Sequence, residues 1–167
     1  RGISQRRIKL TGYLKNDVKP VDHGVGEKLT ASPLWPQQRV TWLAANARPE
    51  EYPIILDSLR HLMSSMAELL LVLVPHPSAN AERVAAMCRQ RGFLVARHSR
   101  SEIVKRSTQV LLVEAVGSLG NLYRQSDVVL VGGSFQVKES DDILLPAAAA
   151  APMIVGPQIS SHRDLYV

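Results

Sequence analysis

The sequence predicts an α/β fold: a Rossmann-like parallel sheet of about six strands with helices on both faces. Short apolar strands alternate with amphipathic helices along most of the chain, which is typical of sheets built from β-α-β units. Several strands, such as 69–74 and 110–113, are apolar without interruption, as expected for strands buried on both faces. The length of 167 residues fits one domain.

The first 38 residues are predicted to form one strand and a linker. Apolar and polar residues alternate from Ile8 to Leu14, as in a strand. Prolines and glycines interrupt any periodicity from Asp17 to Gln38, which indicates a linker. We therefore assign residues 1–38 to a first strand and linker, and residues 39–167 to the remainder of the single domain.

The pattern then predicts three strands and two helices in the first half of the domain. A strand begins at Val40, and a long helix follows from Pro49. The apolar residues of that helix recur three or four positions apart, which predicts one buried stripe: Tyr52, Ile55, Leu56, Leu59, Leu62, Met63 and Met66. Next come a strand over 69–74, a helix over 79–91 ended by Gly92, and a strand over 93–96.

The second half contains three more strands. They are predicted over 110–113, 127–131 and 153–155, separated by a short helix around 119–123 and another over 144–151. Ligands of such sheets bind beyond the carboxyl ends of the strands. The expected binding regions are therefore Asn46, His76, 114–118 and 132–142.

The composition narrows the classes of partner and chemistry. A net charge of +5 and a pI of about 9.7 favour anionic partners such as nucleotides, nucleic acid or lipid headgroups. The sequence has no apolar run long enough for a transmembrane segment, and no export signal. We expect the single cysteine, Cys88, to be a core residue. Zinc-ligand spacing, a Walker motif and a hydrolase triad are not seen in the sequence, so we predict no metal, cofactor or catalytic residues.

Six blocks of sequence follow one another along the chain in a distinctive order. The most specific are Ser107–Leu112 and the spacing from Tyr123 to Gly132-Gly133-Ser134. The other blocks are Thr11–Asp17, Ala44–Asn46 with Glu50-Glu51, Leu73–Pro77, and Leu144 to Gly156-Pro157 with Arg163-Asp164. Together they resemble the Kdo transferases, which move 3-deoxy-manno-octulosonic acid (Kdo) from CMP-Kdo onto lipid A precursors.

The resemblance implies one half of a GT-B fold, in which two Rossmann-like domains face each other across a cleft. The chain resembles the C-terminal half, which binds the donor, and it ends before the closing helices of such a domain. We therefore expect the N-terminal acceptor domain to be absent, and transfer by this chain alone not to occur. The family would act at the cytoplasmic face of the inner membrane in a bacterium, and in the mitochondrion of a eukaryote.

The resemblance also implies a nucleotide-sugar site. Its residues would be His76, Gly117, Ser118, Gly132, Gly133, Ser134 and Asp142. The chain departs from the family pattern at several of these places. The family sequence GGHNPLEPA reads Glu139–Ala147 here, with acids at Glu139, Asp141 and Asp142. The arginine of LVPRHP, the glutamate of GEL (Ser118 here) and a histidine near Asn46 are missing, which predicts a degenerate site.

Each of these features also has a plainer interpretation. Gly132-Gly133-Ser134 fits a phosphate loop or simply a tight turn, and His76 fits a base or a loop side chain. Asp141-Asp142 fits a metal site or a helix cap, and we expect Asp142 to cap the helix that follows. The basic stretch Arg97 to Arg100 fits phosphate contacts or a solvated loop.

Two functions follow from the sequence. The first is a degenerate, Kdo-transferase-like donor domain whose partner is a CMP-sugar. The second is a non-catalytic structural subunit of a larger complex, such as an organellar (mitochondrial) ribosome or a respiratory assembly, with protein or RNA as its partner. A generic nucleotide-binding module is a third possibility, and it requires the Gly132 turn to be open to a ligand.

Overall fold

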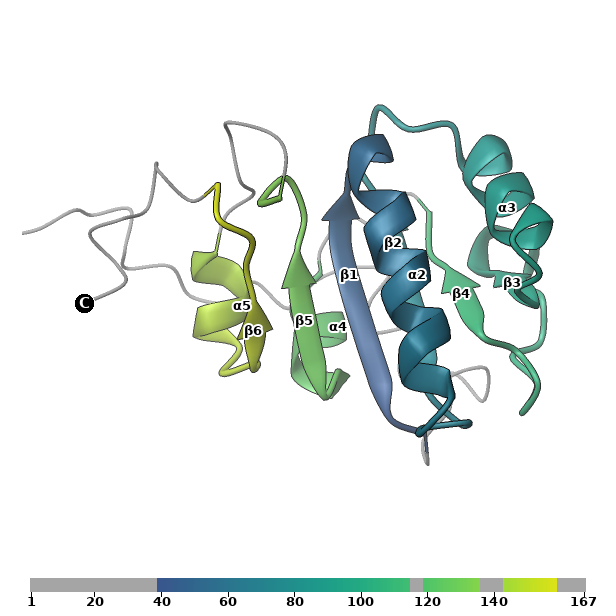
Figure 1. The fold of residues 1–167 in the computed structure, drawn as a ribbon. Coiled ribbons are helices and arrows are strands. Elements are labelled where there is room, and N and C mark those ends of the chain that lie inside the picture. Colours follow the sequence, from purple (N-terminus) through teal and green to yellow (C-terminus); the bar gives the residue numbers. More distant parts are fainter. Residues whose placement is uncertain (1–38, 115–118, 136–142, 159–167) are drawn as a thin grey trace, which may run out of the picture.

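Six strands form one parallel sheet in the computed structural model, which describes residues 39–114, 119–135 and 143–158. The strand order is β3-β4-β2-β1-β5-β6, and every neighbouring pair is parallel (Figure 1). The strands are β1 (Thr41–Ala47), β2 (Leu70–Pro75), β3 (Val95–Arg97), β4 (Val110–Leu112), β5 (Val128–Val131) and β6 (Met153–Ile154). The Rossmann-like prediction is confirmed, while the predicted strand and linker over 1–38 lie outside the described residues.

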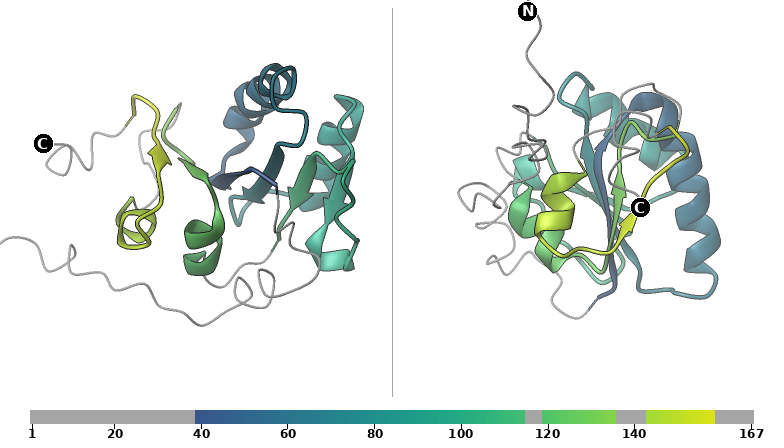
Figure 2. Two further views of the ribbon diagram at one scale, coloured as in Figure 1. Left: turned by 90° about the horizontal axis from the view of Figure 1, so that it is seen from below. Right: turned by 90° about the vertical axis from the view of Figure 1, so that its left-hand side faces the viewer.

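Helices cover both faces of the sheet, as Figure 2 shows edge-on. Helices α2 (Tyr52–Met63) and α3 (Ala81–Gln90) lie on what we call the first face, and α4 (Gly120–Gln125) and α5 (Leu144–Ala148) lie on the second face. Two short 3-10 helices, η3 (Pro49–Glu51) and η4 (His98–Arg100), complete the described elements.

Each face has its own hydrophobic core because side chains alternate along a strand. Leu71 and Leu73 of β2 point into the first core with Ile55 and Leu59 of α2, while Val72 points into the second. Cys88 lies fully buried in the first core, as predicted, and burial raises the pKa of its thiol to about 11. Strands buried on both faces explain the uninterrupted apolar runs of the sequence.

Polar contacts fix the ends of elements. The Asn80 side chain caps α3 by accepting the N–H of Arg83 at 3.1 Å. Gly92, just past the end of α3, has a φ of +85°, which favours glycine. At the amino end of the sheet, the N–H and hydroxyl of Thr41 both donate to Asp127 Oδ2, at 2.7 and 3.1 Å, and join β1 to β5.

The predicted single stripe of the long helix is wrong at its carboxyl end. Helix α2 ends at Met63, so Met66 lies beyond it. Leu62 and Met66 are 36% and 39% exposed, because the part of the first face next to α2, over β5 and β6, carries no described helix. Helix α5 is also shorter than predicted: it ends at Ala148, and Ala150 adopts a φ of +54°.

No helix among the described residues is long and apolar enough to cross a membrane.

Candidate functional site at the carboxyl edge of the sheet

The strand order changes direction at β1, although all the strands are parallel. Strands β2, β4 and β3 lie on one side of β1, and β5 and β6 lie on the other. Helix α2 follows β1 on the first face, whereas α5 follows β5 on the second face, so the connections diverge at the carboxyl ends of β1 and β5. Open α/β sheets bind ligands at such a switch point.

We call Asn46, Arg48, Glu51, Gly132, Gly133 and Ser134 the switch-point cluster. The pairing of β1 with β2 shifts register between Ala44 and Ala47, and Asn46 within this irregularity has a φ of +51°. Asparagine tolerates the left-handed region better than most residues. The strand end is thus bent next to the switch point, a common place for a β-bulge.

Gly132 brings the end of β5 against this bend. A Cβ atom at Gly132 would lie 2.3 Å from the Asn46 carbonyl oxygen and 2.5 Å from that of Ala45. The Gly132 N–H donates to the Ala45 oxygen at 2.8 Å. Gly133 follows with a φ of +71°, which also favours glycine. The two glycines are therefore required by the turn itself.

The carboxylate of Glu51 stabilises the turn that follows β5 by accepting its backbone N–H groups. Glu51 is fully buried, at 0% exposure. Its Oε2 accepts the N–H groups of Arg48 and Gly133 at 3.0 and 2.9 Å, and its Oε1 accepts the N–H of Phe135 at 3.2 Å. Three backbone donors thus satisfy a buried charge that would otherwise be costly.

The Ser134 hydroxyl is also engaged inside the protein. It donates to the Val131 carbonyl oxygen and accepts the N–H of Gly156 at 2.9 Å, and Ser134 has 0% exposure. A Cβ at Gly156 would lie 2.3 Å from the Ser134 oxygen, so the chain after β6 packs tightly on the turn. A ligand would therefore approach this edge through groups other than the Ser134 hydroxyl.

His76 lies at the same edge, after β2. Its N–H donates to the Ala47 oxygen at 2.9 Å, and its Nδ1 is 2.8 Å from Ser78 Oγ. The structure thus brings His76, Gly132, Gly133 and Ser134 to one edge of the sheet. Gly117, Ser118 and Asp142 lie outside the described residues, as do Glu139 and Asp141. The cap position of α5 falls on Ile143, which has no side-chain acceptor.

A second polar cluster occupies this edge at the outer strands, and we call it the outer ion cluster: Glu82, Arg97 and Glu114. Arg97, at the end of β3, is 5% exposed and donates to Glu114 Oε1 at 2.8 Å and to Glu82 Oε1. The hydrogen bond from Arg97 lowers the pKa of Glu82, and its bond to Glu82 raises the pKa of Arg97. Of the two interpretations of the basic stretch, the solvated loop is therefore wrong for Arg97.

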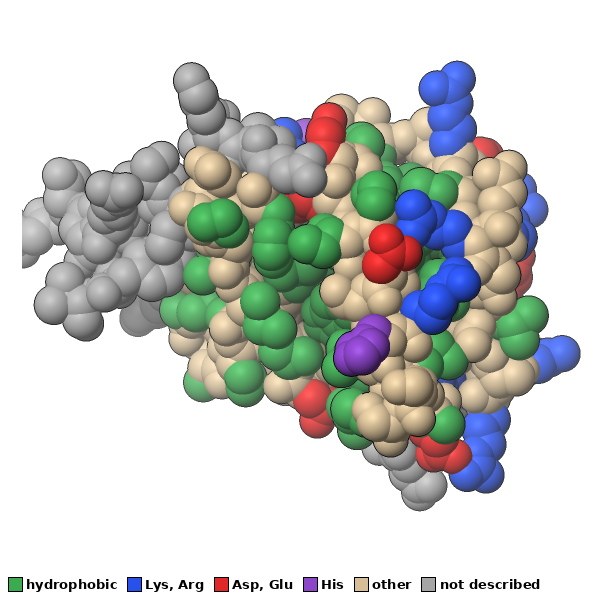
Figure 3. Space-filling model, in the orientation of Figure 1, with side chains coloured by type: hydrophobic (Ala, Val, Ile, Leu, Met, Phe, Trp, Pro, Cys, Tyr) green, Lys and Arg blue, Asp and Glu red, His purple; other side chains and the backbone are tan. Residues whose placement is uncertain are grey.

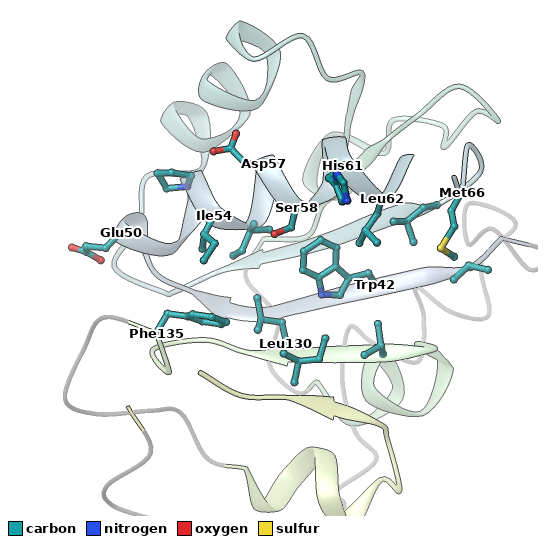
Figure 4. A pocket seen from close by; sticks show the side chains of 16 residues that line it. Trp42, Glu50, Ile54, Asp57, Ser58, His61, Leu62, Met66, Leu130 and Phe135 are labelled. Atoms are coloured by element: carbon teal, nitrogen blue, oxygen red, sulfur yellow. The ribbon is translucent and has the colours of Figure 1, made fainter. Parts of the chain in front are cut away.

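A large hollow lies on the first face and reaches this edge at Glu50 and Phe135. This apolar groove, of about 1010 Å³, runs between α2 and strands β1, β5 and β6. Figure 4 shows Trp42, Leu130 and Phe135 facing Ile54 and Leu62 of α2 across it, and Figure 3 shows the hydrophobic surface that results. Only a few polar side chains line it, including Glu50, Asp57 and His61.

Metal chemistry finds no support in the residues that are described. Among them, His, Cys, Asp and Glu side chains do not gather in a group of three that could hold a metal ion.

Sequence comparison connects this fold to known proteins, although no protein-family model matches the chain. It is 31% identical over 165 residues to the 3-deoxy-D-manno-octulosonic acid transferase of Haemophilus influenzae, a match that covers 99% of this chain and 39% of that protein. The chain is a homologue of the Kdo transferases. A probable mitochondrial Kdo transferase of Arabidopsis thaliana is 26% identical over 151 residues, covering 89% of this chain and 34% of that protein.

A solved structure narrows the Kdo transferase relationship to one domain. The C-terminal CMP-Kdo binding domain of WaaA from Acinetobacter baumannii has a TM-score of 0.74 and 26% identity, and the match covers 84% of this chain and 72% of that one. The chain therefore has the fold of one half of a GT-B enzyme, as predicted. It spans between a third and two fifths of the length of the two curated Kdo transferases named above.

Sequence analysis did not single out Arg48 and did not predict the burial of Glu51. Glu51 precedes Ile55 and Leu59 at four-residue spacing, so helical phase places it on the buried side of α2. That spacing was the signal available for Glu51. The sequence carried no such signal for Arg48, because its role depends on its position beside a turn more than eighty residues further along the chain.

Proposed function

We propose that this chain is a donor-side, Kdo-transferase-like domain that binds a CMP-activated sugar at the switch-point cluster. In this proposal the domain does not transfer Kdo to a lipid A precursor by itself. Transfer across a cleft requires a second wall that positions the acceptor and excludes water.

One observation carries the proposal: the A. baumannii domain, which matches most of this chain in fold and is 26% identical, is a CMP-Kdo binding domain. The bent end of β1, Gly132 and Gly133 form a close backbone approach at the switch point, where Rossmann-like folds bind nucleotides. The basic pI of about 9.7 suits an anionic ligand.

The degenerate character of the site remains part of the proposal. The sequence places Glu139, Asp141 and Asp142 where the family has glycines, histidine and asparagine. The N–H groups of Gly133 and Phe135 are already donated to Glu51. Both features reduce what the turn can offer to a phosphate, so we expect weaker binding than in an intact family site.

Isothermal titration of the purified domain with CMP and with a CMP-sugar tests the proposal. We expect saturable binding at sub-millimolar concentration, and weaker binding of UMP and GMP, which carry the same phosphate on a different base and serve as controls. A flat titration with both cytidine ligands would contradict the donor-site function.

A second candidate is a non-catalytic structural subunit of a larger assembly, such as an organellar ribosome or a respiratory complex. The apolar groove favours it, because open apolar surfaces of this kind mark protein contacts. This candidate predicts no CMP binding, together with elution of the native protein from its source in a large particle of fixed composition.

A further inference from the structure

The side chain of Arg48, at the switch point, has a buried hydrogen-bond donor without an acceptor. Arg48 follows β1 directly and is half-buried. Its Nε atom is buried and has no hydrogen-bond partner, and the side chain forms no ion pair with any residue that the structure describes. A buried charged donor without an acceptor is costly, so an acceptor from a ligand would relieve that cost.

The backbone fixes where this side chain begins. The N–H of Arg48 donates to Glu51 Oε2 at 3.0 Å, and the same oxygen accepts the N–H of Gly133 at 2.9 Å. One carboxylate oxygen therefore joins Arg48 to the turn after β5. The carboxylate makes this connection through backbone N–H groups and leaves the guanidinium unneutralised.

Two arginines at the outer strands of this edge are already engaged. Arg97 is committed to Glu82 and Glu114 in the outer ion cluster, and Arg100 donates to Glu82 at 2.8 Å. The family arginine before the His-Pro pair is missing here, since His76 follows Pro75 directly. A guanidinium binds phosphate through two parallel hydrogen bonds, which histidine cannot match.

We propose that Arg48 is the anion-binding side chain of this domain and binds the phosphate of the nucleotide sugar, in place of the missing arginine. Glu51 acts as a positioning residue that holds Arg48 beside the glycine turn. The inference rests on the proposed function for the identity of the ligand, whereas the anion site itself stands on the geometry of Arg48.

The test separates the phosphate from the nucleoside. Wild-type protein, Arg48→Ala and Arg48→Lys are titrated with CMP and with cytidine, with Arg100→Ala as a matched control for loss of one positive charge. Loss of Arg48 should weaken CMP about tenfold or more and change cytidine affinity about twofold at most. Lysine should restore only part of the affinity, and Arg100→Ala should bind as the wild type does.

A second measurement observes the atom itself. In proton–nitrogen NMR spectra, the Arg48 Nε–H signal is assigned by its disappearance in Arg48→Lys, and it should shift on addition of CMP and of inorganic phosphate. Equal CMP affinity in wild type and Arg48→Ala, with no shift of this signal, would overturn the inference while leaving donor binding intact. If wild-type protein binds no CMP but phosphate still shifts the signal, the donor function fails and the anion site stands. If neither ligand binds or shifts the signal, both fail.

Discussion

The switch-point cluster and the outer ion cluster both bury charge at the carboxyl edge of the same sheet, but they satisfy it differently. Glu51 is held by three backbone N–H groups, whereas Arg97 is held by two carboxylate side chains. A backbone donor is removed only by a substitution with proline, whereas a side-chain partner is removed by almost any substitution. The comparison teaches that Glu51 is hard to replace, while the outer ion cluster can be exchanged as a unit.

The largest expected effect is loss of the Glu51 carboxylate. Glu51→Ala leaves the N–H groups of Arg48, Gly133 and Phe135 without an acceptor, and each unsatisfied buried donor costs ~1–3 kcal/mol. We expect the free energy of unfolding, measured in urea, to fall by about 4 kcal/mol. The exposed neighbour provides the control, since Glu50→Ala should change it by less than about 0.5 kcal/mol. Similar values for the two variants would mean that the switch-point cluster does not depend on the Glu51 carboxylate.

Next comes the close approach at Gly132. Gly132→Ala places a Cβ 2.3 Å from the Asn46 oxygen, against backbone that cannot rotate away. We expect a loss of about 3 kcal/mol in the same urea measurement. Gly92→Ala is the matched control: it also strains a glycine, with a φ of +85°, but its Cβ meets no atom within 4 Å, so about 1 kcal/mol is expected. Equal losses would mean that contact with β1 is unimportant.

The outer ion cluster should tolerate a paired exchange. Arg97→Met alone leaves Glu114 without its partner, at 11% side-chain exposure, and should cost about 2 kcal/mol, less than the ~3–5 kcal/mol typical of a fully buried pair. The double variant Arg97→Met with Glu114→Leu should recover most of that loss. Thermal unfolding followed by circular dichroism decides the matter, and a double variant less stable than the single one would contradict the expected difference between the clusters.

The smallest effect is a pH dependence. The hydrogen bond from Arg97 lowers the pKa of Glu82 in the folded protein. A lowered folded-state pKa means that the unfolded state binds the proton more readily as pH falls. The stabilisation is therefore fully present above the ordinary glutamate pKa and is lost as pH falls through the lowered value. Urea unfolding between neutral and acid pH measures how the free energy of unfolding falls with pH. That fall should be smaller in Glu82→Gln than in the wild type, and an equal fall in both proteins would count against the ion pair.

How much the sequence predicts depends on how local each signal is. The strands at 69–74 and 110–113 are apolar runs, and the structure places β2 and β4 there. The burial of Arg97 could not be predicted, because its partners Glu82 and Glu114 lie 15 and 17 residues away and meet it only after β3 and β4 pair. For the same reason, the placement of β4 between β2 and β3 is a tertiary outcome.

The candidate site divides in the same way. The glycines at 132 and 133 predict a turn from the sequence alone. In the structure Gly132 is required by a close approach to the backbone of β1, and Gly133 by its positive φ. The sequence could not predict that Glu51 binds this turn, because Glu51 and Gly133 are 82 residues apart. Apolar pattern also predicted Leu62 and Met66 as core, but no described helix covers them.

The apolar groove has a practical consequence for handling the folded domain. Environment-sensitive dyes such as ANS fluoresce when they bind exposed apolar surface, and the groove of about 1010 Å³ offers the exposed side chains of Ile54, Leu62 and Met66. The native protein should therefore be bright with such a dye before any heating. Dye fluorescence would then report occupancy of the groove, and a substance that fills it would dim the signal without unfolding the chain.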